Sequence, residues 1–74
     1  MTFRILWNWP ALVSFYNLHP HTAMIVDRAV IRFAEHGEGH LRWVAPYHRL
    51  RAGLYDAVLA LDIEARTVTL YQMR

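Results

Sequence analysis

The second half of the chain alternates between short apolar runs and turn signals, and this pattern limits the folds that are open to it. Four runs are strand-like: HLRWV, YHRLRA, LYDAVLAL and TVTLYQM, at residues 40–44, 47–52, 54–61 and 67–73. The intervening segments around APY, AGL and DIEAR are short enough for hairpin connections. Because short hairpins join neighbouring antiparallel strands, the pattern predicts an antiparallel meander.

The first half of the chain carries a different pattern, with signals for a strand and a helix. Residues 3–7, FRILW, suit a short opening strand. The segment NWP ends this strand, since Asn8 can cap a helix and Pro10 can occupy its first turn. We expect a first helix over roughly residues 10–18, and its apolar residues surround it almost completely, which predicts burial on two sides.

A second helix is expected over roughly residues 21–36, after the break LHPH. Thr22 or His21 can cap its first turn. Apolar residues then recur at helical spacing on one face: Val26, Ala29, Val30 and Phe33. Gly37 follows where the end of a helix favours a left-handed residue. The pattern therefore predicts an amphipathic helix with one buried face.

The order of these elements indicates an α+β fold. We expect an N-terminal strand and a two-helix hairpin packed on one face of a small antiparallel β-sheet, within a single domain over residues 1–74. The predicted core consists of Val30, Phe33, Leu50, Val58 and Leu70. A helix through residues 55–62 would contradict this prediction.

The chain is rich in apolar residues for its length. It has 74 residues, of which 55% are hydrophobic, and ten are aromatic. A chain this short buries only about 60% of the surface that its unfolded form exposes. Some apolar surface should therefore stay exposed, above all on the first helix with Trp9, Leu12, Phe15 and Tyr16, and such surface predicts a partner protein or self-association.

All eight basic residues are arginine, so each cation is a planar fork suited to carboxylate or phosphate. The net charge of +2 permits contact with nucleic acid without requiring it. The chain has no cysteine, which fits a reducing compartment. It also has no long apolar run and no leader-like N-terminus, so we expect a complete cytoplasmic protein that does not bind membranes.

The predicted strand at residues 47–52 brings basic and aromatic side chains together. Side chains alternate along a strand, so Tyr47, Arg49 and Arg51 share one face and His48 and Leu50 share the other. If Leu50 packs under the helices, the arginines point outward and can grip phosphates while Tyr47 stacks on a base. The simpler alternative is a solvated strand face with no ligand.

Three segments in this order resemble the RelE/ParE superfamily of bacterial toxins: FRILWNWPAL, RFAEHGEGHLRWV and YHRLRAGLYDAVLALDIEARTVTLYQM. The resemblance covers essentially the whole chain, and residues 47–55 are its most specific part. In the family an opening strand ends near W-N-P-x-A, a helical hairpin follows, and a Y-R-L-R-x-G-x-Y-R run leads into two apolar strands.

The RelE branch of this family implies ribosome-dependent cleavage of mRNA without a metal. There an RNA 2′-hydroxyl attacks its own phosphate while basic residues stabilise the charged transition state. The resemblance implies catalytic roles for Arg49, Arg51 and Arg74 and substrate-binding roles for Tyr47, Tyr55 and Arg42. The ParE branch implies poisoning of DNA gyrase instead, with no nuclease site. Either branch implies a cognate antitoxin that donates a helix or strand and forms a toxin-antitoxin hetero-oligomer.

Two departures from the family pattern affect the predicted activity. Asp56 stands where the family has arginine, and this anion should repel RNA. A two-residue turn at Gly53 and Leu54 would also set Arg51 opposite Asp56 as a cross-strand pair. In addition, the chain ends at Arg74, about where the family continues to further basic and acid/base residues. We therefore expect weak or absent nuclease activity, and the alternatives of an enzyme and of a non-enzymatic protein-binding module both stay open.

The histidines give no clear catalytic or metal signal. His48 should point away from Arg49, which favours a packed or rim position over proton transfer. His36 and His40 flank GEG, but a two-histidine site without a placed carboxylate is a poor metal site. Glu35 and Glu38 are interpreted as capping and surface charge. Neither a metal nor a cofactor is predicted.

Overall fold

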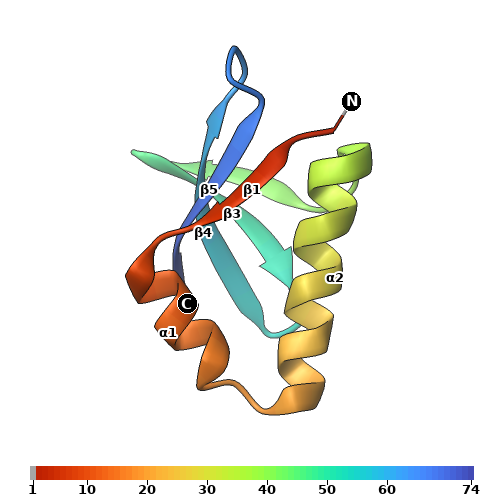
Figure 1. The fold of residues 1–74 in the computed structure, drawn as a ribbon, viewed down its shortest axis with the longest axis vertical. Helices are drawn as coiled ribbons and strands as arrows, with labels where there is room; N and C mark the ends of the chain where they lie inside the picture. The colour runs from red at the N-terminus through yellow and green to blue at the C-terminus, as the bar shows by residue number, and fades with distance from the viewer. Residues whose placement is uncertain (1) are drawn as a thin grey trace.

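One short strand, two helices and a four-stranded meander follow one another along the chain (Figure 1). The computed structural model describes residues 2–74. The elements are β1 (Arg4–Trp7), α1 (Trp9–Tyr16), α2 (Pro20–His36), β2 (Leu41–Val44), β3 (Tyr47–Ala52), β4 (Tyr55–Asp62) and β5 (Thr67–Met73). The predicted α+β class is confirmed, and residues 55–62 form a strand as expected.

The strands form one five-stranded sheet in the order β1-β5-β4-β3-β2. The meander from β2 to β5 is antiparallel, as predicted. The expectation of a wholly antiparallel sheet was wrong, because β1 pairs in parallel with β5 and aligns Arg4 with Thr67. The two helices carry the chain from β1 to β2, at the opposite edge of the sheet. The meander then brings β5 back beside β1, and the two strands can pair in parallel because no hairpin turn joins them.

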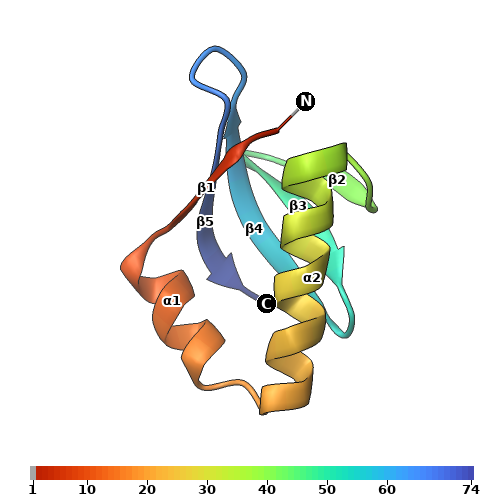
Figure 2. The same ribbon diagram turned by 45° about the vertical axis from the view of Figure 1, so that its right-hand side comes forward.

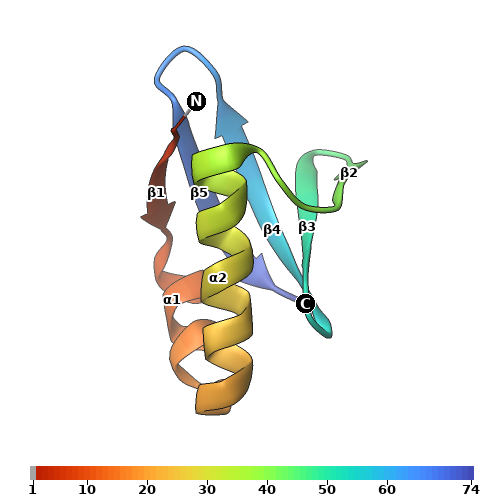
Figure 3. The same cartoon turned by 90° about the vertical axis from the view of Figure 1, so that its right-hand side faces the viewer.

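Both helices contribute to one core under a single face of the sheet (Figures 2 and 3). Val30, Phe33, Leu50 and Leu70 are buried in this core, as predicted. Val58 is also buried but does not belong to it. Because Ala57 and Leu59 point into the core, alternation places Val58 on the opposite face, next to its strand partner Arg49.

The helix ends differ in part from the expectation. Asn8 occupies the N-cap position of α1, but its side chain makes no capping hydrogen bond. His19, not Thr22 or His21, caps α2, since its side chain accepts a hydrogen bond from the backbone N–H of His21 at 3.1 Å. At the other end of α2, Gly37 adopts the left-handed conformation with φ of 69°. The sequence signal for that end is therefore confirmed.

Helix α1 leaves much of its apolar surface exposed. Ala11 is its fully buried residue, whereas Trp9 is 74% exposed and Tyr16 is 75% exposed. Phe15 does pack, against the ring of Trp7 at a centroid distance of 4.9 Å.

Within residues 2–74, no helix combines the length and apolar character needed to span a membrane.

Candidate functional site

The sheet face opposite the helices carries a cluster of charged side chains from three adjacent strands. Leu50 and Ala52 of β3 are buried toward the helices, so alternation turns Arg49 and Arg51 to the other face. Arg42 of β2 is the strand partner of Arg49. The predicted outward position of the two β3 arginines is thus what the structure shows.

Asp56 of β4 lies at the centre of this cluster. Its Oδ2 accepts a hydrogen bond from Nη2 of Arg42 at 2.6 Å and lies 3.9 Å from Nη1 of Arg49. Its Oδ1 lies 3.5 Å from Nη1 of Arg51. The predicted turn sets Arg51 opposite Asp56, so the cross-strand pair is confirmed. The tighter contact is with Arg42, two strands away, and alternation along one hairpin cannot reveal such a diagonal pair.

The Asp56 carboxylate is the most buried of the charged groups in this cluster. Its side chain is 12% exposed, whereas the side chain of Arg49 is 29% exposed and the other two arginines are more open. A buried carboxylate needs compensating cations, and guanidinium groups supply them with directional hydrogen bonds. Three cations around one anion leave the cluster with a net charge of +2. We refer to Arg42, Arg49, Arg51 and Asp56 as the arginine cluster.

Arg74 continues the same face at the end of β5. Its backbone exchanges two hydrogen bonds with the backbone of Asp56, at 2.6 and 2.9 Å. Its side-chain Nε donates to Oε1 of Gln72 at 3.2 Å. The structure therefore brings Arg74, which the resemblance to the toxin family offers as a stand-in for one basic group, beside the arginine cluster.

A hollow of about 330 Å³ adjoins the arginine cluster. Its lining residues come from the β2–β3 turn and from β3, β4 and β5: Val44, Ala45, Pro46, Tyr47, Arg49, Val58, Tyr71, Gln72 and Arg74. The ring of Tyr47 lies against that of Tyr71, with centroids 4.9 Å apart and planes inclined by 36°. We call this hollow the tyrosine hollow.

No pattern in the sequence indicated Tyr71 as a residue of this site. The β4–β5 register shifts between Val58 and Leu59, which pair with Gln72 and Leu70 respectively. Tyr71 is the extra residue on β5, and such a bulge redirects a side chain. Because a bulge depends on how two strands fit together, the spacing along β5 alone does not reveal it.

Tyr55 lies away from the arginine cluster. It precedes Asp56 and pairs with Ala52, whose side chain is buried toward the helices. Alternation therefore puts Tyr55 on the helix-covered face. The structure does not bring this predicted substrate-binding residue together with the arginines.

His36, His40 and His48 occupy three different settings. His48 packs edge-on against Trp43 at 4.9 Å, in keeping with a packed position and not with proton transfer beside Arg49. His40 lines a separate hollow of about 490 Å³ together with Arg42 and Arg51. His36 lies 3.8 Å from Glu35 on the surface. In the described part of the chain, no group of three or more potential metal ligands comes together.

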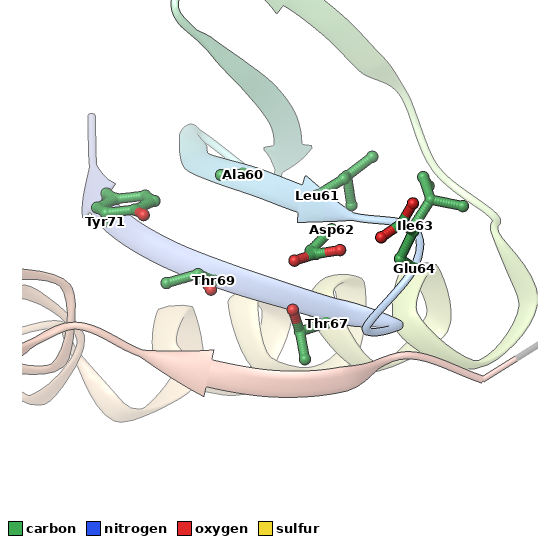
Figure 4. A pocket seen from close by; sticks show the side chains of 8 residues that line it. All are labelled: Ala60, Leu61, Asp62, Ile63, Glu64, Thr67, Thr69 and Tyr71. Atoms are coloured by element: carbon green, nitrogen blue, oxygen red, sulfur yellow. The ribbon is translucent and has the colours of Figure 1, made fainter.

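Two acidic regions lie outside the arginine cluster. Glu38 accepts a hydrogen bond from Arg32 at 2.6 Å, and this bond together with the guanidinium charge lowers the pKa of the Glu38 carboxyl. A shallow hollow on the β4–β5 hairpin includes Asp62 and Glu64 (Figure 4). Asp62 accepts a hydrogen bond from the backbone of Ala65 at 3.0 Å and so stabilises the turn. Glu38 and Asp62 therefore stabilise local structure at the surface.

No protein-family model and no curated protein matches the chain. Its structure, however, is similar to a chain in the crystal structure of the toxin-antitoxin complex RelBE2 from Mycobacterium tuberculosis. The TM-score is 0.69 at 20% sequence identity, and the match covers 99% of this chain and 96% of the other. The chain therefore has the same fold as that chain of the RelBE2 complex. On this fold, the arginine cluster and the tyrosine hollow occupy the sheet face that the helices leave uncovered.

Proposed function

We propose that this chain is the toxin of a type II toxin-antitoxin pair and that its uncovered sheet face binds RNA. The observation that carries the proposal is the convergence of Arg42, Arg49, Arg51 and Arg74 on one face of a RelE-like toxin fold. Arginine forks match the geometry of phosphate oxygens. The similar chain of known structure comes from a toxin-antitoxin complex, which supports an antitoxin as partner.

For a RelE-like mRNA interferase, Arg49, Arg51 and Arg74 would stabilise the negative charge that develops on the scissile phosphate. Asp56 opposes this role, because its carboxylate already contacts guanidinium groups that would otherwise be available to bind the phosphate. We therefore propose RNA binding with weak or absent cleavage on ribosomes.

The contacts of Asp56 also favour a second candidate function, that of a non-enzymatic protein-binding module. A ParE-like gyrase poison would be one form of it, since that activity requires no nuclease site. In either case the arginine cluster would bind a partner surface instead of a reacting phosphate. If the wild-type protein does not bind RNA, this second candidate is favoured.

The antitoxin partnership predicts a clear difference between the free and the co-expressed chain. Because Trp9 and Tyr16 expose large apolar surfaces, the isolated chain should self-associate, whereas co-expression with the product of an adjacent short reading frame should give a soluble hetero-oligomer. Size-exclusion chromatography with light scattering measures both states. The double variant Trp9→Ser and Tyr16→Ser should self-associate less. A stable monomer of the isolated wild type at high concentration would contradict the prediction.

A further inference from the structure

Strand β2 forms one edge of the sheet, and no other strand among residues 2–74 pairs with its outer side (Figure 3). Its apolar side chains are open as well, since Trp43 is 62% exposed and Val44 is 40% exposed. An open strand edge offers unpaired N–H and C=O groups to which a further strand can bond. The β2 edge therefore has both the polar and the apolar surface that such a strand would cover.

The outward backbone groups of β2 belong to Leu41 and Trp43. The carbonyl of His40 accepts a hydrogen bond from the N–H of Arg51 at 2.9 Å, one position before the pair of Leu41 with Leu50. Pairs that exchange hydrogen bonds alternate with pairs that do not along an antiparallel ladder. The N–H and C=O groups of Leu41 and Trp43 therefore point away from β3. Among residues 2–74, no turn or loop backbone bond reaches either residue.

The charge that could protect this edge is turned away from it. Charged side chains usually keep edge strands from pairing with other chains, and Arg42 is the one charged residue of β2. Its guanidinium, however, donates a hydrogen bond to Asp56 at 2.6 Å. Because Asp56 lies on β4, two strands further into the sheet, this contact directs the Arg42 side chain inward over β3. The outer side of β2 is left to Trp43 and Val44.

We propose that β2 pairs antiparallel with β2 of a second copy of this chain and extends the five-stranded sheet across both copies. A two-fold axis makes such an interface self-complementary, because each copy offers the same groups. A register centred on Arg42 would set two guanidinium groups directly opposite each other, which is destabilising. A register centred on Trp43 matches outward backbone groups with outward backbone groups. It sets Arg42 opposite Val44 of the second copy and brings the two Trp43 side chains together.

The dimer should be weak and reversible. Strand β2 has 4 residues, and pairing two such strands makes a contact that belongs among the interfaces below about 1,200 Å². Because the axis of an antiparallel strand pair is perpendicular to the sheet, both arginine clusters would lie on the same face of the extended sheet. Trp43 is the large side chain of the contact, and the loss of an interface tryptophan typically weakens binding by at least about 30-fold.

The test measures dimerisation of the full-length chain by sedimentation velocity at increasing micromolar concentrations. The chain carries Trp9→Ser and Tyr16→Ser, so that association through α1 does not contribute. We expect a monomer–dimer equilibrium, which Trp43→Lys should weaken by at least about 30-fold. Ile63→Lys is the matched control, because Ile63 is 63% exposed and lies in the β4–β5 turn, away from β2. It should leave the equilibrium unchanged.

Amide hydrogen exchange on the same chain, without a substitution at Trp43, locates the contact. The outward N–H of Trp43 should exchange more slowly as the protein concentration rises, because it becomes hydrogen-bonded in the dimer. A chain that stays monomeric, a dimer that Trp43→Lys leaves intact, or exchange at Trp43 that does not depend on concentration would each overturn the proposal. Slowing that occurs only when a co-expressed antitoxin is present would overturn it too, since the edge would then bind an antitoxin strand.

Discussion

Replacing Asp56 with arginine is expected to strengthen RNA binding by about 10- to 100-fold at low salt. The substitution removes the carboxylate that holds Arg42 at 2.6 Å and Arg51 at 3.5 Å, and it adds a further cation. Each charge-assisted hydrogen bond that becomes available to a phosphate contributes about 1.5–3 kcal/mol. If two more phosphates are bound, the logarithm of affinity should also fall more steeply with the logarithm of salt, by about 1.4 in slope.

Asp56→Asn is the matched control for this prediction, because it keeps the shape of the side chain and removes only its charge. It should bind RNA more tightly than the wild type and less tightly than Asp56→Arg. Salt-dependent binding to a single-stranded RNA measures the series, and circular dichroism checks that each variant is folded. If Asp56→Arg binds RNA no better than the wild type, the arginine cluster is not a phosphate site.

Cleavage is a separate measurement on the same variants. We expect the wild type to leave a translated message largely uncut in primer-extension mapping, because Asp56 would place an anion in the proposed phosphate site, where it opposes the transition state. Asp56→Arg need not cleave either, since cleavage also requires proton transfer. Strong wild-type cuts that vanish with Arg49→Ala would show an enzyme instead. In that case the loss of cleavage activity in Arg49→Ala should correspond to about 2.7–4 kcal/mol of transition-state stabilisation, which is the cost of removing one hydrogen-bond donor from an oxyanion hole.

Leu50→Ala is expected to lower the free energy of unfolding by about 2–5 kcal/mol. Leu50 is fully buried between the sheet and α2. It also packs closely on Gly39, where an added Cβ would lie only 2.8 Å from the Leu50 Cδ1 atom. The total stability of a 74-residue chain is about 4–11 kcal/mol, so this single change should remove a large part of it. Urea unfolding followed by tryptophan fluorescence measures the loss.

Leu54→Ala is the control for Leu50→Ala, since it deletes the same atoms at a position that is 87% exposed in the β3–β4 turn. Its free energy of unfolding should change by no more than about 0.5 kcal/mol. Similar losses for the two variants would mean that Leu50 is not central to the core.

Local patterns in the sequence determined the elements and much of the arginine face. The helical spacing around Val30 and Phe33 predicted α2, and Gly37 marked its end. The turn at Gly53 predicted the register that pairs Arg51 with Asp56. These features depend on residues that are close along the chain, so short-range geometry is sufficient to predict them.

The remaining features depend on contacts between segments that are far apart in the sequence. The parallel pairing of β1 with β5, the diagonal contact of Arg42 with Asp56 and the bulge at Tyr71 were not predicted. Val58 was assigned to the core because it is apolar, but its face depends on the register of its strand. The tertiary structure decided these points, because strand order and register follow from packing the whole sheet against both helices, which no single segment encodes.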